Sequence, residues 1–292
     1  TLLRSPVPFT LPTKEKKASA FREAVQKLLD KGTLEPVRDF ASPGFYNLLF
    51  LVPKRDGGWR PVIDLSQLNR YLVVPSFKME TPASVSGALE QGEWTTSLDL
   101  KDAFFHVPIA QTSRKFLRFA FSNQVYQFKA LPFGLATAPL VFTRVAQALS
   151  AYCHRRAIRI HVYLDDWLLR AHCRRELIRH TQFVLDLCYR LGLIVNLPKS
   201  SLLPEQIFVF LGIHFDLISF ICRPSEDRWN RLQEILAQFL AQEFMSARQW
   251  QVLIGSLVSM DSQVPLGRLH RRPVQHAFAA RWTRAHGLKA PV

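Results

Sequence analysis

The sequence predicts an α+β fold in which an antiparallel sheet carries helices on one face. Short apolar runs typical of strands are bounded by Gly, Pro, Asn and Asp, and they alternate with segments of helical periodicity. Two of the strand ends carry aspartates. The 292 residues are 48% hydrophobic, which is ample for the core of one large domain or of two to three small ones.

The chain is strongly basic, with a net charge of +15 and a pI near 10.1. The basic residues are spread along the sequence with aromatic residues between them, a pattern that favours a nucleic-acid groove over a basic tail. An incidentally basic soluble protein is the alternative. The four cysteines lack Cys-x-x-Cys spacing and are expected to be reduced thiols of an intracellular protein rather than zinc ligands.

No signal peptide and no apolar run of membrane length is present in the sequence, and we expect no membrane partner. The chain starts at a threonine and has no clear ending, so we expect it to be a segment of a longer protein.

The first elements are a helix and a hairpin. Helical periodicity predicts a helix over 14–31, with Gly32 as its stop. Strands are expected over 46–52 and 59–65, joined by a basic loop at 54–58. Lys54 and Arg60 could donate to triphosphate oxygens there, although exposed basic loop residues are often only solvated.

The middle of the chain is expected to hold a strand that ends at Asp99 and a hairpin of 116–121 with 125–129, turning at 122–124. A small-residue turn over 130–139 then opens a helix over 139–153. Gly134 in this turn allows a base pair or sugar to approach the backbone, and an ordinary loop-to-helix junction is the alternative.

The last part is expected to hold a hairpin over 158–169 and an amphipathic helix over 174–191 ended by Gly192. Short strands follow over 194–196, 207–210 and 213–220, with a bend at Gly212. Helices are predicted over 228–240 and 247–258, and the stretch 268–286 is rich in arginine and histidine.

Two adjacent acids, Asp165 and Asp166, interrupt an apolar run that reads as strand on both sides. A buried unpaired carboxylate costs several kcal/mol, so the pair either sits at a tight hairpin turn or holds cations. Together with Asp99, three carboxylates from two strand ends can chelate two hard divalent cations such as Mg²⁺. Nucleotidyl transfer uses such a pair of ions.

Five sequence motifs resemble those of reverse transcriptases, and they occur in the family's order. The motifs are Leu98-Asp99-Leu100-Lys101-Asp102-Ala103-Phe104-Phe105, Leu131-Pro132-Phe133-Gly134-Leu135, Tyr163-Leu164-Asp165-Asp166, Leu191-Gly192-Leu193 with Asn196 and Lys199, and Phe210-Leu211-Gly212-Ile213. Upstream, Lys54, Trp59-Arg60-Pro61, Asp64-Leu65 and Leu68-Asn69 resemble the family's fingers hairpin. The local sequences within 107–119 and 265–270 are most similar to those of retrotransposons of the tyrosine-recombinase, DIRS-type or Ngaro-like class.

The resemblance implies a right-hand polymerase of fingers, palm and the start of a thumb. It places the fingers at 1–90 with the hairpin 110–130, the palm at 91–223 and a helical thumb or connection segment at 224–292. The implied activity is RNA-directed DNA polymerisation from dNTPs on an RNA or DNA template with a primer. The expected setting is the cytoplasm, the nucleus or both.

The resemblance also assigns residue roles. Asp99, Asp165 and Asp166, helped by the Leu100 carbonyl, would hold two Mg²⁺ ions, with Mn²⁺ as a substitute. Phe104 would act as a steric gate against a ribose 2′-hydroxyl, and Lys199 would protonate pyrophosphate. The remaining implied roles are nucleotide binding by Lys54, Arg60, Phe133 and Gly134 and primer grip by Leu211 and Gly212.

Several of these residues could instead have structural or solvent-exposed roles without a catalytic function. Phe104 could be a core aromatic, Lys199 a solvated lysine and Asp102 a structural turn carboxylate. Phe133 stands where retroviral enzymes carry glutamine, so it can contribute only packing, and the fingers loop is shorter than theirs.

Two other functions stay open from the sequence. One is an RNA-directed RNA polymerase, which Phe104 and Leu164 disfavour; the other is an inactive nucleic-acid-binding remnant of a retroelement. The acids after the primer-grip motif lack the grouping that an RNase H needs, so that activity is expected outside this segment.

Overall fold

A computed structural model describes residues 15–39, 42–53, 59–242, 244–282 and 287. The chain divides into two compact units. Unit 1 comprises Thr1–Met79, Asp99–Tyr152 and Leu185–Asn196, and unit 2 comprises Glu80–Leu98, Cys153–Val184 and Leu197–Val292. The chain therefore passes between the units several times, and one passage falls between Leu98 and Asp99.

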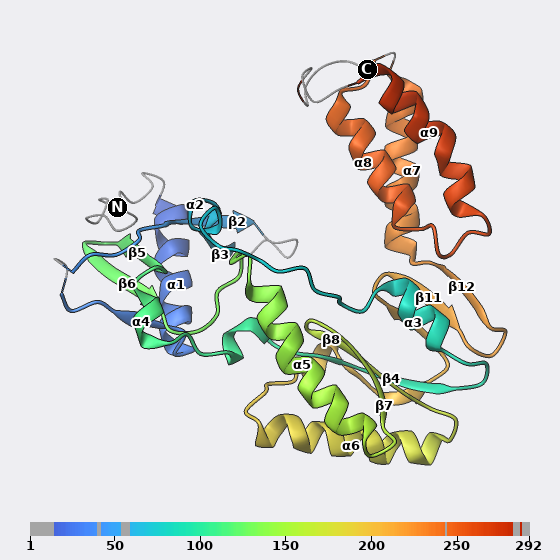
Figure 1. The fold of residues 1–292 in the computed structure, drawn as a ribbon, viewed down its shortest axis with the longest axis horizontal. Coiled ribbons are helices and arrows are strands. Elements are labelled where there is room, and N and C mark those ends of the chain that lie inside the picture. The colour runs from blue at the N-terminus through green and yellow to red at the C-terminus, as the bar shows by residue number, and fades with distance from the viewer. Residues whose placement is uncertain (1–14, 40–41, 54–58, 243, 283–286, 288–292) are drawn as a thin grey trace. The chain divides into compact units, whose positions relative to one another are not determined.

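Unit 1 combines helices with two small sheets, ordered β1-β6-β5 and β2-β3 (Figure 1). Its helices are α1 (Glu15–Asp30), α2 (Ser66–Asn69), η1 (Ala103–His106), α4 (Gln111–Arg114) and α5 (Ala138–His154, through Tyr152). Its strands are β1 (Leu34–Pro36), β2 (Leu48–Pro53), β3 (Trp59–Asp64), β5 (Arg118–Phe121) and β6 (Gln124–Phe128).

The core of unit 1 forms around α1. Its apolar positions Phe21, Val25 and Leu28 recur at helical spacing and are buried against the strands. Gly32 adopts a left-handed φ of +65° directly after the helix, and the Thr33 amide donates to the Leu28 carbonyl. A Gly in this conformation ends the helix at the predicted place.

The hairpin of β5 and β6 turns through two residues rather than the three that the sequence suggested. Phe121 pairs with Gln124, which leaves Ser122 and Asn123 at the tip, both with positive φ. This geometry is that of a type I′ turn, whose twist matches the twist of the flanking strands.

Unit 2 contains a four-stranded sheet of order β7-β8-β4-β9, a three-stranded sheet of order β10-β11-β12, and the C-terminal helices. The strands are β4 (Trp94–Asp99, which runs up to the boundary), β7 (Arg159–Tyr163), β8 (Asp166–Ala171), β9 (Ser201–Glu205), β10 (Ile207–Phe210), β11 (Ile213–Asp216) and β12 (Ile221–Pro224). The helices are α3 (Pro82–Ala88), α6 (Arg174–Arg190, through Val184), η2 (Leu197–Lys199), α7 (Glu226–Ala241), α8 (Ala247–Val258) and α9 (Gly267–Arg281).

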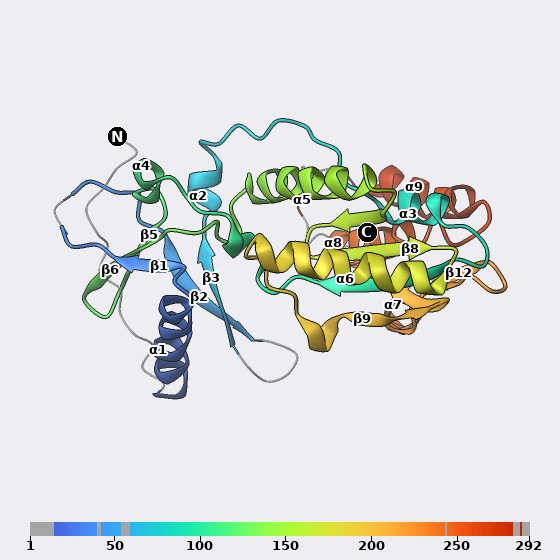
Figure 2. The same ribbon diagram turned by 90° about the horizontal axis from the view of Figure 1, so that it is seen from below.

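Helix α6 lies across one face of the four-stranded sheet (Figure 2). A buried hydrogen bond of 2.8 Å joins the hydroxyls of Thr96 on β4 and Thr181 on α6. Trp167, Leu168 and Leu169 of β8 are all fully buried, so this strand is covered on both faces. The predicted antiparallel sheet backed by a helix is confirmed.

Some elements differ from their predicted bounds. The expected strand over 213–220 is shorter than predicted: β11 ends at Asp216, and a turn leads from it to β12, which pairs with β11. Strands β1, β9 and β12 were not predicted, and 194–196 forms a single bridge, Leu100 with Val195, instead of a strand. Strand β1 has only three residues, too few to show a periodicity.

The C-terminal helices α7, α8 and α9 stand side by side (Figure 1), with Leu232, Leu253 and Met260 at their core. Ser246 begins α8 with a capping box, in which its side chain and that of Gln249 each bond the other's backbone amide. In the part of the chain that the structure describes, no helix combines the length and the apolar character that crossing a membrane requires.

Candidate active site

The acidic pair lies at a tight hairpin tip. Tyr163 at the end of β7 pairs with Asp166 at the start of β8, so Leu164 and Asp165 alone form the turn. Leu164 has a φ of +52°, a conformation that costs a residue with a Cβ of order 1 kcal/mol and is often kept at functional sites. Asp165 is exposed and Asp166 half-buried, which avoids the cost of burying two unpaired charges.

Trp167 stabilises the tip through a hydrogen bond, a role that the sequence did not predict. Its fully buried indole donates from Nε1 to the Leu164 carbonyl at 2.9 Å. The sequence shows an apolar residue in a strand here, and only the turn geometry reveals what its one polar atom does.

Asp99 is the last residue of β4, and β4 is the hydrogen-bonded neighbour of β8. The Asn196 side chain donates from Nδ2 to Asp99 Oδ1 at 2.8 Å. Leu100 follows as a buried residue and forms an isolated antiparallel bridge with Val195. Asp102 begins the short helix η1 with a φ of +53° and pairs with Lys31, in keeping with its predicted structural role.

Phe104 is packed among other aromatic rings of unit 1. Its ring centroid lies 4.9 Å from that of Phe133 and 5.7 Å from that of Phe142, and 9% of the residue is exposed. Phe133 is 46% exposed and also meets Phe105 edge-on. Phe133 therefore packs against the rings of Phe104 and Phe105, and Phe104 offers only a small part of its surface to a ligand.

The turn that carries Gly134 is clamped by Asn69, a contact that the sequence reasoning missed. The Asn69 amide donates to the Gly134 carbonyl at 2.9 Å, and its oxygen accepts from the Ala136 amide at 2.8 Å. Gly134 itself has a φ of +93°, which favours glycine. The sequence contained the Leu68-Asn69 motif as a signal, but not the loop that it binds.

Asp64, just before α2, accepts hydrogen bonds from the hydroxyl and the amide of Ser66. These bonds hold the pKa of Asp64 below its usual value. The carboxylate is thereby committed to ordering the entry into α2.

The predicted phosphate-binding residues are only partly described. Lys54 lies outside the described residues, and for Arg60 the structure gives the backbone alone, paired with Val52 across β2 and β3. Lys199 ends η2 in unit 2 and is exposed.

The predicted primer-grip residues form the tip between β10 and β11. Phe210 pairs with Ile213, so Leu211 and Gly212 make a two-residue turn in which both have positive φ. The guanidinium of Arg228 lies over Gly212 where a Cβ would stand, and the Ser225 amide donates to the Gly212 carbonyl at 3.1 Å. This tip is therefore tied to the start of α7.

Among the described residues, one group outside the predicted site has metal-ligand composition: Glu90, Glu93 and His172, whose ligand atoms all lie within 4.8 Å of one another. Arg159 and Arg170 already pair with both glutamates at 2.9–3.4 Å. Partial desolvation raises the pKa of Glu90, but the Arg170 hydrogen bond and the neighbouring positive charges outweigh it and lower the pKa. Two guanidinium groups disfavour a cation, so we interpret this group as an ion-pair network.

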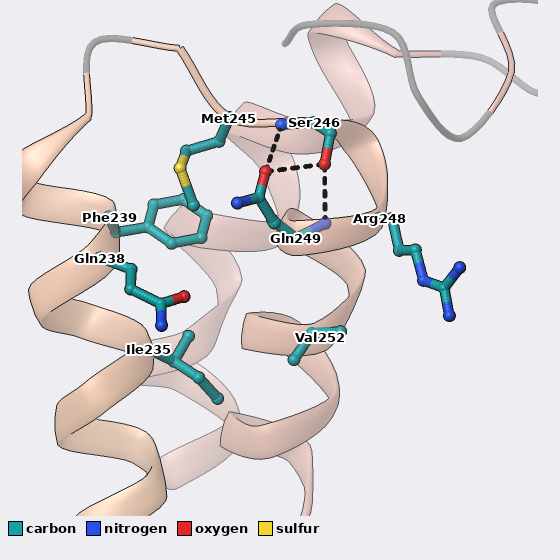
Figure 3. A pocket seen from close by; sticks show the side chains of 8 residues that line it. All are labelled: Ile235, Gln238, Phe239, Met245, Ser246, Arg248, Gln249 and Val252. Atoms are coloured by element: carbon teal, nitrogen blue, oxygen red, sulfur yellow. Dashed lines mark hydrogen bonds between the residues drawn. The ribbon is translucent and has the colours of Figure 1, made fainter.

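A groove of about 190 Å³ lies between α7 and α8 (Figure 3). Ile235, Phe239 and Met245 supply its apolar wall, and Gln249 and Arg248 stand at its rim. None of the predicted site residues lines it.

The family model for "Reverse transcriptase (RNA-dependent DNA polymerase)" matches residues 52–215. The Pol polyprotein of transposon 412 from Drosophila melanogaster is 29% identical over 195 residues, which are 64% of this chain and 15% of that polyprotein. The Pro-Pol polyprotein of simian foamy virus type 3 is 26% identical over 203 residues, 70% of this chain and 17% of that polyprotein. The chain thus spans less than a fifth of either relative.

Solved structures show the same fold. The foamy viral protease-reverse transcriptase in complex with double-stranded DNA has a TM-score of 0.78 at 21% identity, covering 98% of this chain and 48% of that one. The same enzyme with an RNA/DNA hybrid gives 0.74 at 21% identity, covering 97% and 37%. The predicted right-hand polymerase fold is confirmed. With its family model matched over more than half of its length, the chain belongs to the reverse transcriptase (RNA-dependent DNA polymerase) family.

Proposed function

We propose that this chain is the polymerase segment of a retrotransposon polyprotein and adds dNTPs to a primer 3′-hydroxyl on an RNA or DNA template. The observation that carries the proposal is the acidic tip at the start of β8, the strand next to the one that Asp99 ends. Both elements lie inside the matched range 52–215. The similarity of the local sequences within 107–119 and 265–270 to those of DIRS-type or Ngaro-like retrotransposons supports an element of that class.

In this proposal Asp99, Asp165 and Asp166 hold two Mg²⁺ ions, with the Leu100 carbonyl as a further ligand. The donor set fits, because all of these donors are hard oxygens and the tip at Asp165 is exposed. When bound, such ions activate the attacking hydroxyl and stabilise the departing pyrophosphate. The chain's own contribution is to fix the carboxylates at two strand ends, where the backbone is hydrogen-bonded.

The other roles follow the same assignment. Lys54 and Arg60 would bind triphosphate oxygens, Lys199 would donate a proton to pyrophosphate, and Leu211 with Gly212 would support the primer end. Phe104 would select deoxynucleotides with the small part of the residue that is exposed. Phe133 and Gly134 would shape the floor under the incoming base pair.

The proposed partners are an RNA or DNA template, a primer and dNTPs. The net charge of +15 supports binding to a polyanion, and the structural relatives were solved with DNA duplexes and RNA/DNA hybrids. We further propose fingers at 1–90 and 110–130, a palm at 91–223 and a thumb or connection segment at 224–292. The compartment would be the cytoplasm, the nucleus or both, and RNase H activity would lie outside this segment.

Primer extension on an RNA template tests the proposal. We expect Mg²⁺-dependent incorporation of dNTPs, and Asp165→Asn should reduce it about a thousandfold, or ~4 kcal/mol in the barrier, while template binding stays intact. Full activity of Asp165→Asn would contradict the assignment. Salt-dependent duplex binding without any extension by the unmodified chain would instead favour the inactive remnant.

Sugar selection tests the choice between the two polymerase classes. The unmodified chain should prefer dNTPs over rNTPs on the same primer-template. Phe104→Ala should relax that preference if the ring excludes the 2′-hydroxyl, with Phe142→Ala, which removes a ring from the same cluster, as the matched control. A chain that prefers rNTPs would be an RNA-directed RNA polymerase.

A further inference from the structure

We infer that Asn196 is a positioning residue for Asp99, and that the segment Ile194–Asn196 acts as a strap that fixes the Asp99 carboxylate for metal binding. The inference rests on the proposed function, in which Asp99 is a metal ligand. It goes further by assigning to this chain a residue that tunes the ligand without touching the substrate.

The strap runs alongside the residues that follow β4. The Asn196 amide donates to the Asp99 carbonyl at 2.8 Å, and the Lys101 amide donates to the Ile194 carbonyl at 2.8 Å. The bridge between Leu100 and Val195 lies between these two bonds. The backbone that follows the Asp99 side chain, from the Asp99 carbonyl to the Lys101 amide, is thus held by one short segment.

The far end of the strap is fixed by His106 of η1. The Ile194 amide donates to His106 Nε2 at 3.0 Å, so this nitrogen is an acceptor and carries no proton. The proton then lies on Nδ1, which is 3.0 Å from the Ala103 carbonyl and donates to it. The imidazole is therefore neutral, has one defined tautomer, and joins the strap to η1.

The side-chain contact gives the strap its chemical purpose. Asn196 Nδ2 donates to Asp99 Oδ1 at 2.8 Å, and this bond restricts rotation of the carboxylate about its Cβ–Cγ bond. Hydrogen-bond partners that orient a metal ligand typically change metal affinity or activity 10- to 100-fold when they are removed. The backbone hydrogen bonds of the strap would form with any residue at position 196 that has an amide N–H, so they do not explain why an amide side chain bonds the Asp99 carboxylate.

The chain offers a matched control in Asn47, an asparagine with a purely structural set of bonds. Its Nδ2 donates to the carbonyls of Phe45, Phe116 and Arg118 at 3.1–3.3 Å, and it contacts no acid of the proposed site. Asn47→Ala and Asn196→Ala both remove one amide from unit 1, but only the second removes a partner of Asp99.

The experiment measures Mn²⁺ binding to the full chain from the loss of the free-ion electron paramagnetic resonance signal, together with thermal unfolding and primer extension. We expect Asn196→Ala to weaken Mn²⁺ binding about 10-fold or more and to raise the Mg²⁺ concentration needed for half-maximal extension. Asn47→Ala should lower the melting temperature and leave Mn²⁺ affinity unchanged. In an Asp99→Asn background, Asn196→Ala should weaken Mn²⁺ binding no further.

The possible outcomes separate the inference from the proposed function. If Asn196→Ala does not fold, Asn196→Leu supplies the same test with more of the side-chain volume retained. Unchanged Mn²⁺ affinity in a folded Asn196 variant, while Asp99→Asn loses affinity, would overturn the inference and leave the polymerase proposal standing. If the unmodified chain neither binds Mn²⁺ nor extends a primer, the proposed function fails and the inference fails with it.

Discussion

Replacing Trp167 by phenylalanine should disturb the acidic tip while leaving both aspartates in place. The substitution keeps an aromatic ring but removes the Nε1–H that donates to the Leu164 carbonyl at 2.9 Å. Losing a hydrogen bond of this kind costs about 1 kcal/mol, and shrinking a fully buried ring adds a cavity cost of similar size. Together they should destabilise the fold by about 2 kcal/mol, or about 4 to 8 °C in melting temperature.

The effect on activity should exceed the effect on stability. Leu164 holds a left-handed φ of +52°, and the hydrogen bond from Trp167 helps to keep it there. A tip released from this bond shifts Asp165 and Asp166, and a misplacement of ~1 Å can cost about 100-fold in rate. We expect single-nucleotide extension under saturating dNTP to fall at least tenfold at a temperature where the variant is folded.

Trp250→Phe is the matched control for this prediction. The buried Nε1 of Trp250 has no hydrogen-bond partner among the described residues, so its removal should cost less than ~1 kcal/mol and leave extension unchanged. Thermal unfolding followed by circular dichroism and extension assays on both variants give the comparison. Equal melting temperatures for the two variants, with wild-type extension by Trp167→Phe, would refute the reasoning.

Three further variants test the scaffold. Glu93→Gln should lower the free energy of unfolding in urea by roughly 3 kcal/mol, because the fully buried Glu93 neutralises two arginines; a loss under about 0.5 kcal/mol would contradict this. Gly212→Ala should lower the melting temperature and impair extension, since its φ is +73° and a Cβ would overlap Arg228; Arg228→Ala should partly restore both, and no restoration would mean that backbone strain dominates. The hydrogen bond from Arg271 holds the pKa of Asp261 below its usual value, so its stabilising effect is present above the unfolded pKa and is lost as pH falls; Asp261→Asn should flatten the acid side of a melting-temperature profile, and an unaltered profile would exclude the pair as its source.

The sequence was informative where side-chain pattern and backbone conformation depend on the same residues. Phe21, Val25 and Leu28 at helical spacing predicted α1 to within one residue at each end, because one apolar face and one Gly stop define such a helix. The acidic pair also predicted a hairpin tip, because charged residues inside an apolar run avoid the cost of burial when they lie at a solvent-exposed turn.

The supporting contacts could not be predicted, because they join residues far apart in the chain. Asn69 clamps a loop 65 to 67 residues away, and Asn196 bonds an aspartate 97 residues away. Trp167 is near its partner in sequence, yet in a strand its indole reads only as an apolar group. The sequence pattern indicates which face of an element is buried, but it does not indicate which polar atoms form hydrogen bonds with each other.

The two-residue tip between β7 and β8 limits how this gene segment can vary. Side chains alternate between the faces of a strand, so one inserted or deleted residue at the tip would slide Asp166 and everything after it in β8 onto the opposite face. The fully buried run Trp167–Leu169 would then have to exchange its neighbours on both sides at once. Single-codon length changes between Tyr163 and Asp166 should therefore be removed by selection from functional copies.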